Sequence, residues 1–109
     1  MTILEVDTED VEGGVRLVLK GELDLSTVDK VEQELARVED ERHELIVLDL
    51  GGLTFLDSTG LRVIVTADQR ARRAGRRVVV GKGPETVHRV FTITRLDERL
   101  EMVDDVRSL

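Results

Sequence analysis

The sequence predicts a small α/β domain, with a mixed, mostly parallel sheet that is opened by a hairpin and has helices packed on it. Residues 45–50 form a continuous apolar run rich in β-branched side chains, as in a strand buried on both faces of a parallel sheet. Amphipathic helical patterns at residues 28–38 and 61–74 flank this run. With 109 residues, the chain has room for one core, and we expect one domain over residues 1–109.

The chain is expected to open with a hairpin. Apolar and polar residues alternate over residues 3–8, which predicts an edge strand with one solvated face. Gly13 and Gly14 predict a turn, and a second alternating strand follows over residues 15–20. We expect the segment Gly21-Glu22-Leu23-Asp24 to close this hairpin.

A first helix should follow, capped by Ser26 or Thr27. Its apolar positions recur at spacings of three and four and form one stripe: Val28, Val31, Leu35 and Val38. An acidic, polar turn over residues 40–44 then leads into the central strand.

The central strand should end at Gly51-Gly52, and a loop should then carry Phe55 and Leu56. Asp57 or Ser58 is expected to cap a second helix by accepting a hydrogen bond from an unpaired backbone N–H of its first turn. This helix has an apolar, small-residue face: Leu61, Ile64, Val65, Ala67, Ala71 and Ala74. We expect Gly60 to let another surface approach the first turn closely.

The remaining elements are shorter. Gly75 should end the second helix, and residues 77–81 should form a further strand. Pro84 should begin a third helix with an apolar side formed by Val87, Val90 and Phe91. In the tail, a last strand at Leu100, Met102 and Val103 and a terminal helical turn at Val106 and Leu109 are both compatible with the pattern.

Composition argues against several classes of protein. The chain has no cysteine, no signal-like segment and no apolar run of membrane-spanning length. A net charge of −7 argues against general nucleic-acid binding, because phosphate contacts need a basic surface. We therefore expect a cytoplasmic protein, without a membrane or nucleic-acid partner, that meets other proteins.

One basic cluster stands against this acidic background: Arg70, Arg72, Arg73, Arg76 and Arg77. It falls at the end of the second helix, where cations complement the negative end of the helix dipole. A solvated helix end is the favoured interpretation, and partner docking is the alternative.

Metal and catalytic motifs are missing from the sequence. His43 and His88 are isolated, and no metal-binding motif is present. The glycine pairs lack the spacing of nucleotide-binding loops, and Ser58 has no evident histidine base. We predict a protein that is not an enzyme and needs no cofactor or metal.

Two residues are candidates for accepting a phosphoryl group. Asp49, near the carboxyl end of the central strand, could serve a receiver-like domain, although Asp7, Glu9 and Asp10 are poorly placed to bind magnesium and Lys82 is the only late lysine. Ser58 could instead be a plain helix cap. Its flanking residues, including the apolar pair Phe55-Leu56, favour a docking surface around a modifiable hydroxyl.

These residues amount to a resemblance. The segment Leu48-Asp49-Leu50 through Phe55-Leu56-Asp57-Ser58-Thr59-Gly60-Leu61 resembles the signature of the STAS domain in bacterial anti-sigma factor antagonists, and Gly21-Glu22-Leu23-Asp24 is similar to a second motif of that family. The likeness spans essentially the whole chain.

The resemblance implies a phosphorylation switch. In such proteins the serine after the motif aspartate, here Ser58, is phosphorylated by an anti-sigma factor that is also a GHKL-type serine kinase, and a PP2C-type phosphatase reverses the reaction. The unmodified form binds the anti-sigma factor and releases its sigma factor. The partner-binding residues expected around the acceptor are Asp24, Phe55, Leu56, Asp57, Thr59 and Gly60.

An alternative keeps the fold but changes the function. The chain could be a stand-alone STAS scaffold, or the small partner of a lipid- or anion-transport assembly, without a phosphorylation switch. Retention of Ser58 within the full Asp57-Ser58-Thr59-Gly60-Leu61 pattern favours the switch.

Overall fold

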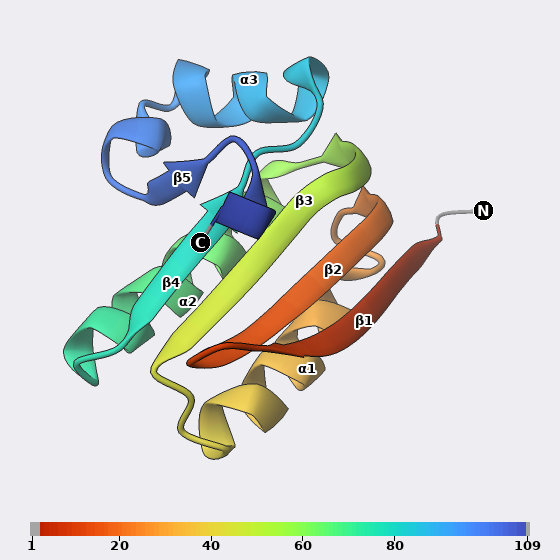
Figure 1. Cartoon of the computed structure of the whole chain (residues 1–109). Helices are drawn as coiled ribbons and strands as arrows, with labels where there is room; N and C mark the ends of the chain where they lie inside the picture. Colours follow the sequence, from red (N-terminus) through yellow and green to blue (C-terminus); the bar gives the residue numbers. More distant parts are fainter. Residues whose placement is uncertain (1–2, 109) are drawn as a thin grey trace.

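The computed structural model describes residues 3–108, and Figure 1 shows the arrangement of its elements. The order along the chain agrees with the expected alternation of strands and helices, and the last strand that the tail pattern allowed is present. The elements are β1 (Leu4–Val11), β2 (Gly14–Leu23), α1 (Val28–Asp40), β3 (Leu45–Leu56), α2 (Ser58–Arg73), β4 (Arg77–Gly81), α3 (Glu85–Ile93), η1 (Leu96–Glu98), β5 (Glu101–Val103) and η2 (Val106–Ser108).

The five strands form one sheet in the order β1-β2-β3-β4-β5. β1 and β2 pair antiparallel, whereas the three other pairs are parallel. The predicted mixed, mostly parallel sheet opened by a hairpin is therefore confirmed. β1 lies at one edge, as its alternating pattern indicated.

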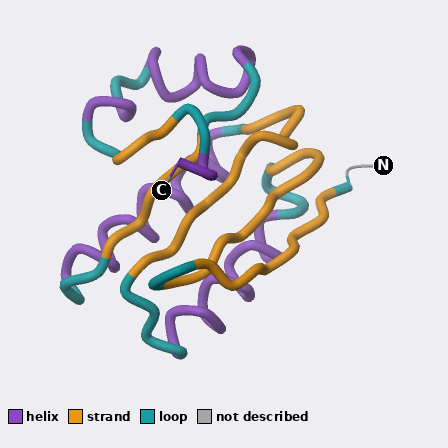
Figure 2. Tube along the Cα trace, viewed as in Figure 1, coloured by secondary structure: helices purple, strands orange, loops and turns teal. Residues whose placement is uncertain are grey.

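α1 and α2 cover one face of the sheet, and α3 lies beyond the carboxyl end of β4 (Figure 1). The tube in Figure 2 shows that η2 crosses the opposite face. Between the sheet and α1 and α2 lies a core built from the inward side chains of β2 and β3, among them Leu17, Leu19, Leu48 and Leu50. The whole predicted stripe of α1 is buried against it.

Both central strands extend further than the sequence suggested. β2 runs through Gly21 to Leu23, so the segment expected to close the hairpin belongs mostly to a strand. β3 continues past Gly51-Gly52 to Leu56, where it pairs with Leu23. The pairing shifts register on the way, between Val18 and Lys20 and again between Gly21 and Glu22. Gly21 in β2 and Gly51-Gly52 in β3 therefore lie where the hydrogen-bond ladder between the two strands is irregular, and neither strand ends there.

The predicted helix ends are largely confirmed. Asp57 caps α2, Gly75 follows its last turn with φ +71°, and Pro84 precedes α3. Thr27 occupies the cap position of α1, but its side chain makes no capping bond. In the tail, β5 pairs with β4 and η2 contains Val106. The expectation for Leu109 lies outside the described residues.

Candidate functional site

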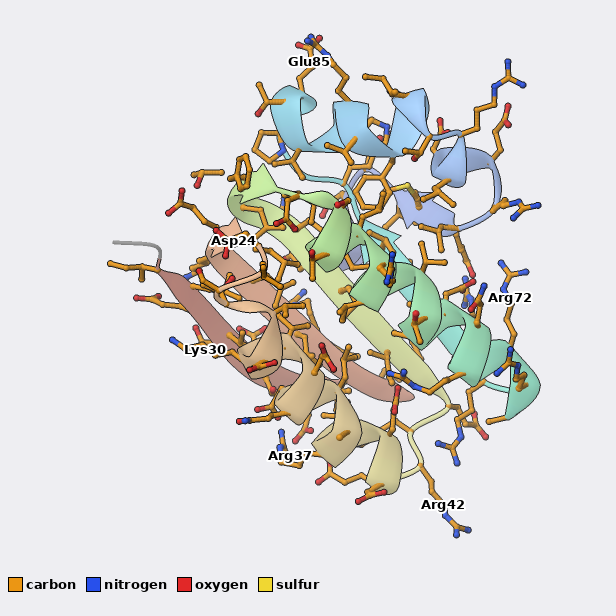
Figure 3. The ribbon with its side chains drawn as sticks, turned by 180° about the vertical axis from the view of Figure 1, so that it is seen from behind. Asp24, Lys30, Arg37, Arg42, Arg72 and Glu85 are labelled. Atoms are coloured by element: carbon orange, nitrogen blue, oxygen red, sulfur yellow. The ribbon has the colours of Figure 1, made fainter. Side chains whose placement is uncertain are left out.

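The candidate site lies where β2 and β3 end side by side. Because these strands are parallel and Leu23 pairs with Leu56, the segments that follow them emerge at the same edge of the sheet. The Asp57 N–H donates to the Leu23 carbonyl at 3.2 Å. The loop between β2 and α1 is thereby held against the beginning of α2, and Figure 3 shows Asp24 of this loop above the first turn of α1.

Asp57 connects the two segments through its carboxylate. Oδ1 accepts a hydrogen bond from the Gly60 N–H at 2.9 Å, which caps α2. Oδ2 accepts one from the Leu25 N–H at 3.1 Å. Both oxygens bind backbone groups and neither binds the Ser58 hydroxyl, so Asp57 has a structural role in fixing the shape of the site.

Asp24 and Thr27 organise the loop between β2 and α1. Asp24 Oδ1 accepts hydrogen bonds from the Ser26 hydroxyl at 2.7 Å and the Ser26 N–H at 2.9 Å. The bond from the Ser26 hydroxyl is the main cause that lowers the pKa of Asp24 from its usual value. The Thr27 hydroxyl donates to the Glu22 carbonyl at 2.8 Å and accepts from the Asp24 N–H at 3.0 Å. Asp24 is thus a negative charge on an ordered loop.

Ser58 is the first residue of α2 and its side chain is exposed. Within residues 3–108, its hydroxyl makes no hydrogen bond, unlike the hydroxyls of Ser26 and Thr27. The first turn of α2 contains no acidic residue. The hydroxyl is thus exposed and free of hydrogen bonds at the positive end of a helix dipole. A negative charge added to it, such as that of a phosphoryl group, would be stabilised there. The neighbouring Thr59 is partly buried.

The apolar pair predicted for a loop is divided between surface and core. Both residues belong to β3; Phe55 is 48% exposed, whereas Leu56 is 5% exposed and joins the core. Gly60 is buried as well, and a Cβ there would lie 2.6 Å from Leu23 Cγ and 2.8 Å from Leu56 Cδ1. The close approach that we expected at Gly60 is therefore made by the chain's own core and not by an outside surface.

Leu25 is the site residue that the sequence reasoning missed. Its side chain is 74% exposed, and its N–H is bound by Asp57, a residue 32 positions away. A signal was present, because Leu25 is an apolar residue between two polar loop residues and belongs to neither periodic pattern. Leu25 and Phe55 are thus exposed apolar residues on the two segments that meet at Asp57, the residue before Ser58.

The side chains of a receiver-like site are not brought together. Asp49 Oδ1 accepts from the Gly51 N–H at 2.9 Å, and Lys82 pairs with Asp104 at 2.8 Å. Asp7, Glu9 and Asp10, which we expected to be poorly placed for magnesium, lie on β1, which β2 separates from β3. Among residues 3–108, no group of three possible metal ligands forms.

Most of the basic cluster is engaged in holding the fold together. Arg70 pairs with Glu39 at 2.9 Å and Arg72 pairs with Asp68 at 2.9 Å. Arg76 donates to the Glu39 carbonyl, and Arg77 forms an ion pair with Glu101. These contacts favour the helix-end interpretation over partner docking.

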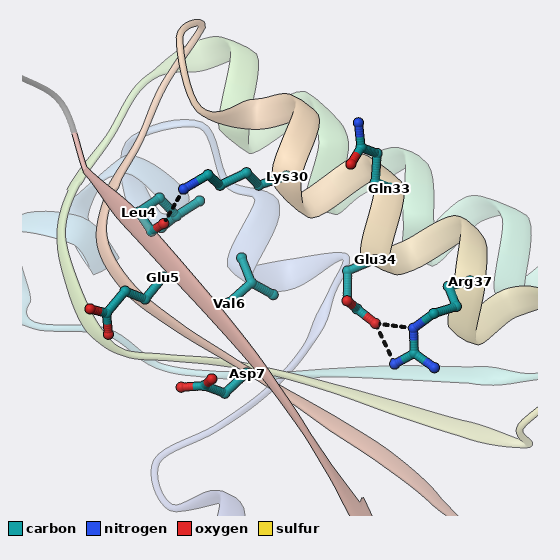
Figure 4. Close-up of a pocket in the computed structure, with 8 residues that line it drawn as sticks. All are labelled: Leu4, Glu5, Val6, Asp7, Lys30, Gln33, Glu34 and Arg37. Atoms are coloured by element: carbon teal, nitrogen blue, oxygen red, sulfur yellow. Dashed lines mark hydrogen bonds and ion pairs between the residues drawn. The ribbon is translucent and has the colours of Figure 1, made fainter.

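A hollow of about 580 Å³ lies away from Ser58, between β1 and α1 (Figure 4). Lys30 Nζ crosses it and donates to the Leu4 carbonyl at 3.0 Å, and Arg37 forms an ion pair with Glu34 beside it. Lys30 thus reaches from α1 to a carbonyl of the edge strand β1, and covering an edge strand in this way protects it against pairing with another chain. None of the residues around Ser58 lines this hollow. In the part of the chain that the structure describes, no helix is long and apolar enough to cross a membrane.

Comparison with known proteins gives one consistent family. The family model described as the STAS domain matches residues 5–109. The anti-sigma F factor antagonist of Paenibacillus polymyxa is 31% identical over 103 residues, which cover 94% of this chain and 88% of that protein.

Solved structures share the fold. An anti-sigma factor antagonist from Mycobacterium paratuberculosis has a TM-score of 0.85 at 23% identity, covering 97% of this chain and 90% of that chain. The Bacillus cell fate determinant SpoIIAA in its phosphorylated form has a TM-score of 0.73 at 18% identity, covering 95% of this chain and 96% of that chain.

Proposed function

Because the chain belongs to the STAS domain family, we propose that it is an anti-sigma factor antagonist controlled by phosphorylation of Ser58. In its unmodified form it binds an anti-sigma factor that is also a GHKL-type serine kinase, which releases the sigma factor. Phosphorylation ends this binding, and a PP2C-type phosphatase restores it. The chain acts in the cytoplasm as a regulator and carries out no catalysis of its own.

The observation that carries this proposal is the exposed, uncommitted hydroxyl of Ser58 at the amino end of α2. Two exposed apolar residues, Leu25 and Phe55, belong to the segments that meet at Asp57, directly before Ser58. A partner that covers these two side chains also covers the hydroxyl. We therefore expect the modified residue Ser58 to lie within the docking surface that Leu25 and Phe55 contribute to. SpoIIAA, a protein of this fold, has been solved in a phosphorylated form, which supports the idea that the fold accepts the modification.

In the transfer step, Ser58 Oγ bonds to the γ-phosphorus of ATP as the bond to the β,γ-bridging oxygen breaks. ADP leaves, and the hydroxyl proton passes to a base of the kinase. The nucleotide and its magnesium ion belong to the kinase, so this chain supplies only the acceptor oxygen and the geometry that presents it.

The effect on binding is electrostatic. The phosphoryl group adds about −1.5 to −2 charges, beside the carboxylates of Asp24 and Asp57. At the amino end of α2 this charge is compatible with the helix dipole, so the fold survives. A partner bound over Ser58 would exclude water from the phosphoryl group and so leave its charge without solvation. A hundredfold loss of affinity needs only about 2.7 kcal/mol, less than the roughly 3 to 5 kcal/mol that an uncompensated buried charge costs.

The proposal is tested by affinity capture with the immobilised full chain, with and without ATP, followed by identification of the bound protein. We expect a GHKL-type kinase to be captured without ATP and released with it. Ser58→Ala should retain the kinase in both conditions, whereas the control Thr92→Ala, which removes an exposed hydroxyl from α3, should behave as the wild type. Release of Ser58→Ala by ATP, or capture of a transporter that ignores ATP, would contradict the proposal.

A further inference from the structure

Arg62 lies one helical turn after Ser58 on α2. The two residues are separated by four positions within one continuous helix, and both side chains are exposed. Side chains at this spacing lie on the same face of a helix, with their Cβ atoms about 5 to 6 Å apart. Helical side chains also lean toward the amino end. The guanidinium of Arg62 can therefore reach over the hydroxyl of Ser58.

Arg62 is also a cation without a partner. Among residues 3–108 its guanidinium makes no hydrogen bond or ion pair, whereas Arg70 and Arg72 of the same helix bind carboxylates. It lines a groove between α1 and α2 together with Glu32 and Glu39 of α1. Glu39 is bound to Arg70, and Arg62 pairs with neither carboxylate among residues 3–108. An exposed arginine without a carboxylate partner can take up a new anion.

The other acidic groups near Ser58 accept hydrogen bonds within the site and form no ion pair with Arg62 among residues 3–108. Asp57 uses both carboxylate oxygens on the N–H groups of Leu25 and Gly60, and Asp24 Oδ1 is bound by Ser26. The first turn of α2 adds no acidic residue. A phosphoryl group on Ser58 would therefore be the strongest anion within one turn of Arg62.

We propose that Arg62 is the intramolecular counter-ion of phosphorylated Ser58, with its guanidinium donating to the phosphoryl oxygens across one turn of α2. The inference rests on the proposed modification of Ser58. Guanidinium and phosphate match in geometry and form charge-assisted, often bidentate hydrogen bonds. Arg62 is thus a positioning residue that holds the phosphate against the helix.

The pairing gives the switch a second component. In the unmodified chain Arg62 is free to meet an acidic group on the partner. In the phosphorylated chain it pairs with Ser58, and its single positive charge offsets only part of the about −1.5 to −2 charges of the phosphate. The partner therefore meets a net negative charge and also loses a cation. One modification then changes two charges on the docking surface.

The test measures the second ionisation of phosphoserine, incorporated at position 58 during translation, by phosphorus NMR across pH. The pairing stabilises the dianion, so Arg62→Gln should raise this pKa by about 0.3 units or more relative to the wild type. The matched control Arg73→Gln removes the same charge at the far end of the same helix and should leave the pKa unchanged. High salt should reduce the difference. Equal pKa values in all three proteins would overturn the proposal.

The NMR measurement can fail or succeed separately from the proposed function. The phosphoserine is incorporated without a kinase, so a captured kinase that ignores Ser58 would refute the switch and leave the NMR measurement intact. Circular dichroism of the three proteins should coincide, because Arg62 and Arg73 are exposed.

Discussion

The carboxylate of Asp57 accepts a hydrogen bond from the backbone N–H of Leu25 at 3.1 Å, across 32 positions of sequence. Its other oxygen caps α2 through Gly60. One side chain therefore fixes both the amino end of the helix that carries Ser58 and the loop that carries the exposed Leu25. The candidate docking surface depends on this connection.

Replacing Asp57 with asparagine should separate its two roles. The amide oxygen can still accept from Gly60, but the amide nitrogen cannot accept from Leu25. Since one hydrogen bond contributes about 0.5 to 1.5 kcal/mol net, amide hydrogen exchange at Leu25 should accelerate roughly twofold to tenfold. Exchange at Gly60 serves as the internal control and should change little. Unchanged exchange at Leu25 would show that the bond does not order the loop.

Gly60→Ala should destabilise the fold, although alanine favours helices. The new Cβ would lie 2.6 Å from Leu23 Cγ and 3.0 Å from the Leu23 carbonyl oxygen. Overpacking of this kind costs about 1 to 3 kcal/mol, which urea denaturation can measure. The neighbouring Thr59→Ala is the control and should stay within about 0.5 kcal/mol of the wild type. Equal stability of both variants would contradict this prediction and would mean that the core rearranges to accommodate the new methyl group without cost.

The sequence predicted the elements whose signal is local. The stripe of α1 and the apolar face of α2 repeat every three to four residues, and all four stripe residues of α1 are buried. Asp57 as cap and Gly75 as terminator follow from backbone geometry within one turn. The hairpin and the buried central strand were readable for the same reason.

The features that were missed depend on pairing between distant segments. β3 continues through Gly51-Gly52 because β2 lies beside it and continues as well. Leu56 is buried because that extension brings it opposite Leu23. The bond between Asp57 and Leu25 needs both strands to end together. None of these relationships leaves a periodic trace in the sequence.

The apolar side chains beside Ser58 should contribute to binding and little to stability. Leu25→Ala and Phe55→Ala should each weaken capture of the partner kinase by at least about fivefold, equivalent to about 1 kcal/mol. Ile93→Ala removes an equally exposed apolar residue from α3 and is the control; it should bind within about twofold of the wild type. Isothermal titration calorimetry of the kinase with each of the three variants measures these affinities. A loss at Ile93 alone would place the docking surface on α3.

Stability should fall on acidification partly through Glu101. Its hydrogen bond with Arg77 is the main cause that lowers the pKa of Glu101 in the folded chain, and the pair joins β5 to the start of β4. A carboxyl group with a lowered folded pKa stabilises the fold above its unfolded pKa, and this contribution is lost as pH falls through the folded value. The effect is small because solvent screens both exposed side chains.

Thermal unfolding at neutral and acidic pH measures this contribution. Glu101→Gln should lower the Tm at neutral pH, and the difference from the wild type should shrink as the pH falls through the folded-state pKa of Glu101. Glu98→Gln, which removes an equal charge from an exposed residue of η1, controls for net charge. A Tm difference that persists unchanged in acid would assign the effect to packing.

The central claim is that phosphate on Ser58 controls partner binding. The direct measurement is the Kd of the captured kinase for the unmodified chain and for the chain with phosphoserine at position 58, with no ATP present. We predict at least a hundredfold weaker binding of the phosphorylated chain, equivalent to about 2.7 kcal/mol. Kd values within about twofold of each other, with both chains folded by circular dichroism, would contradict the account.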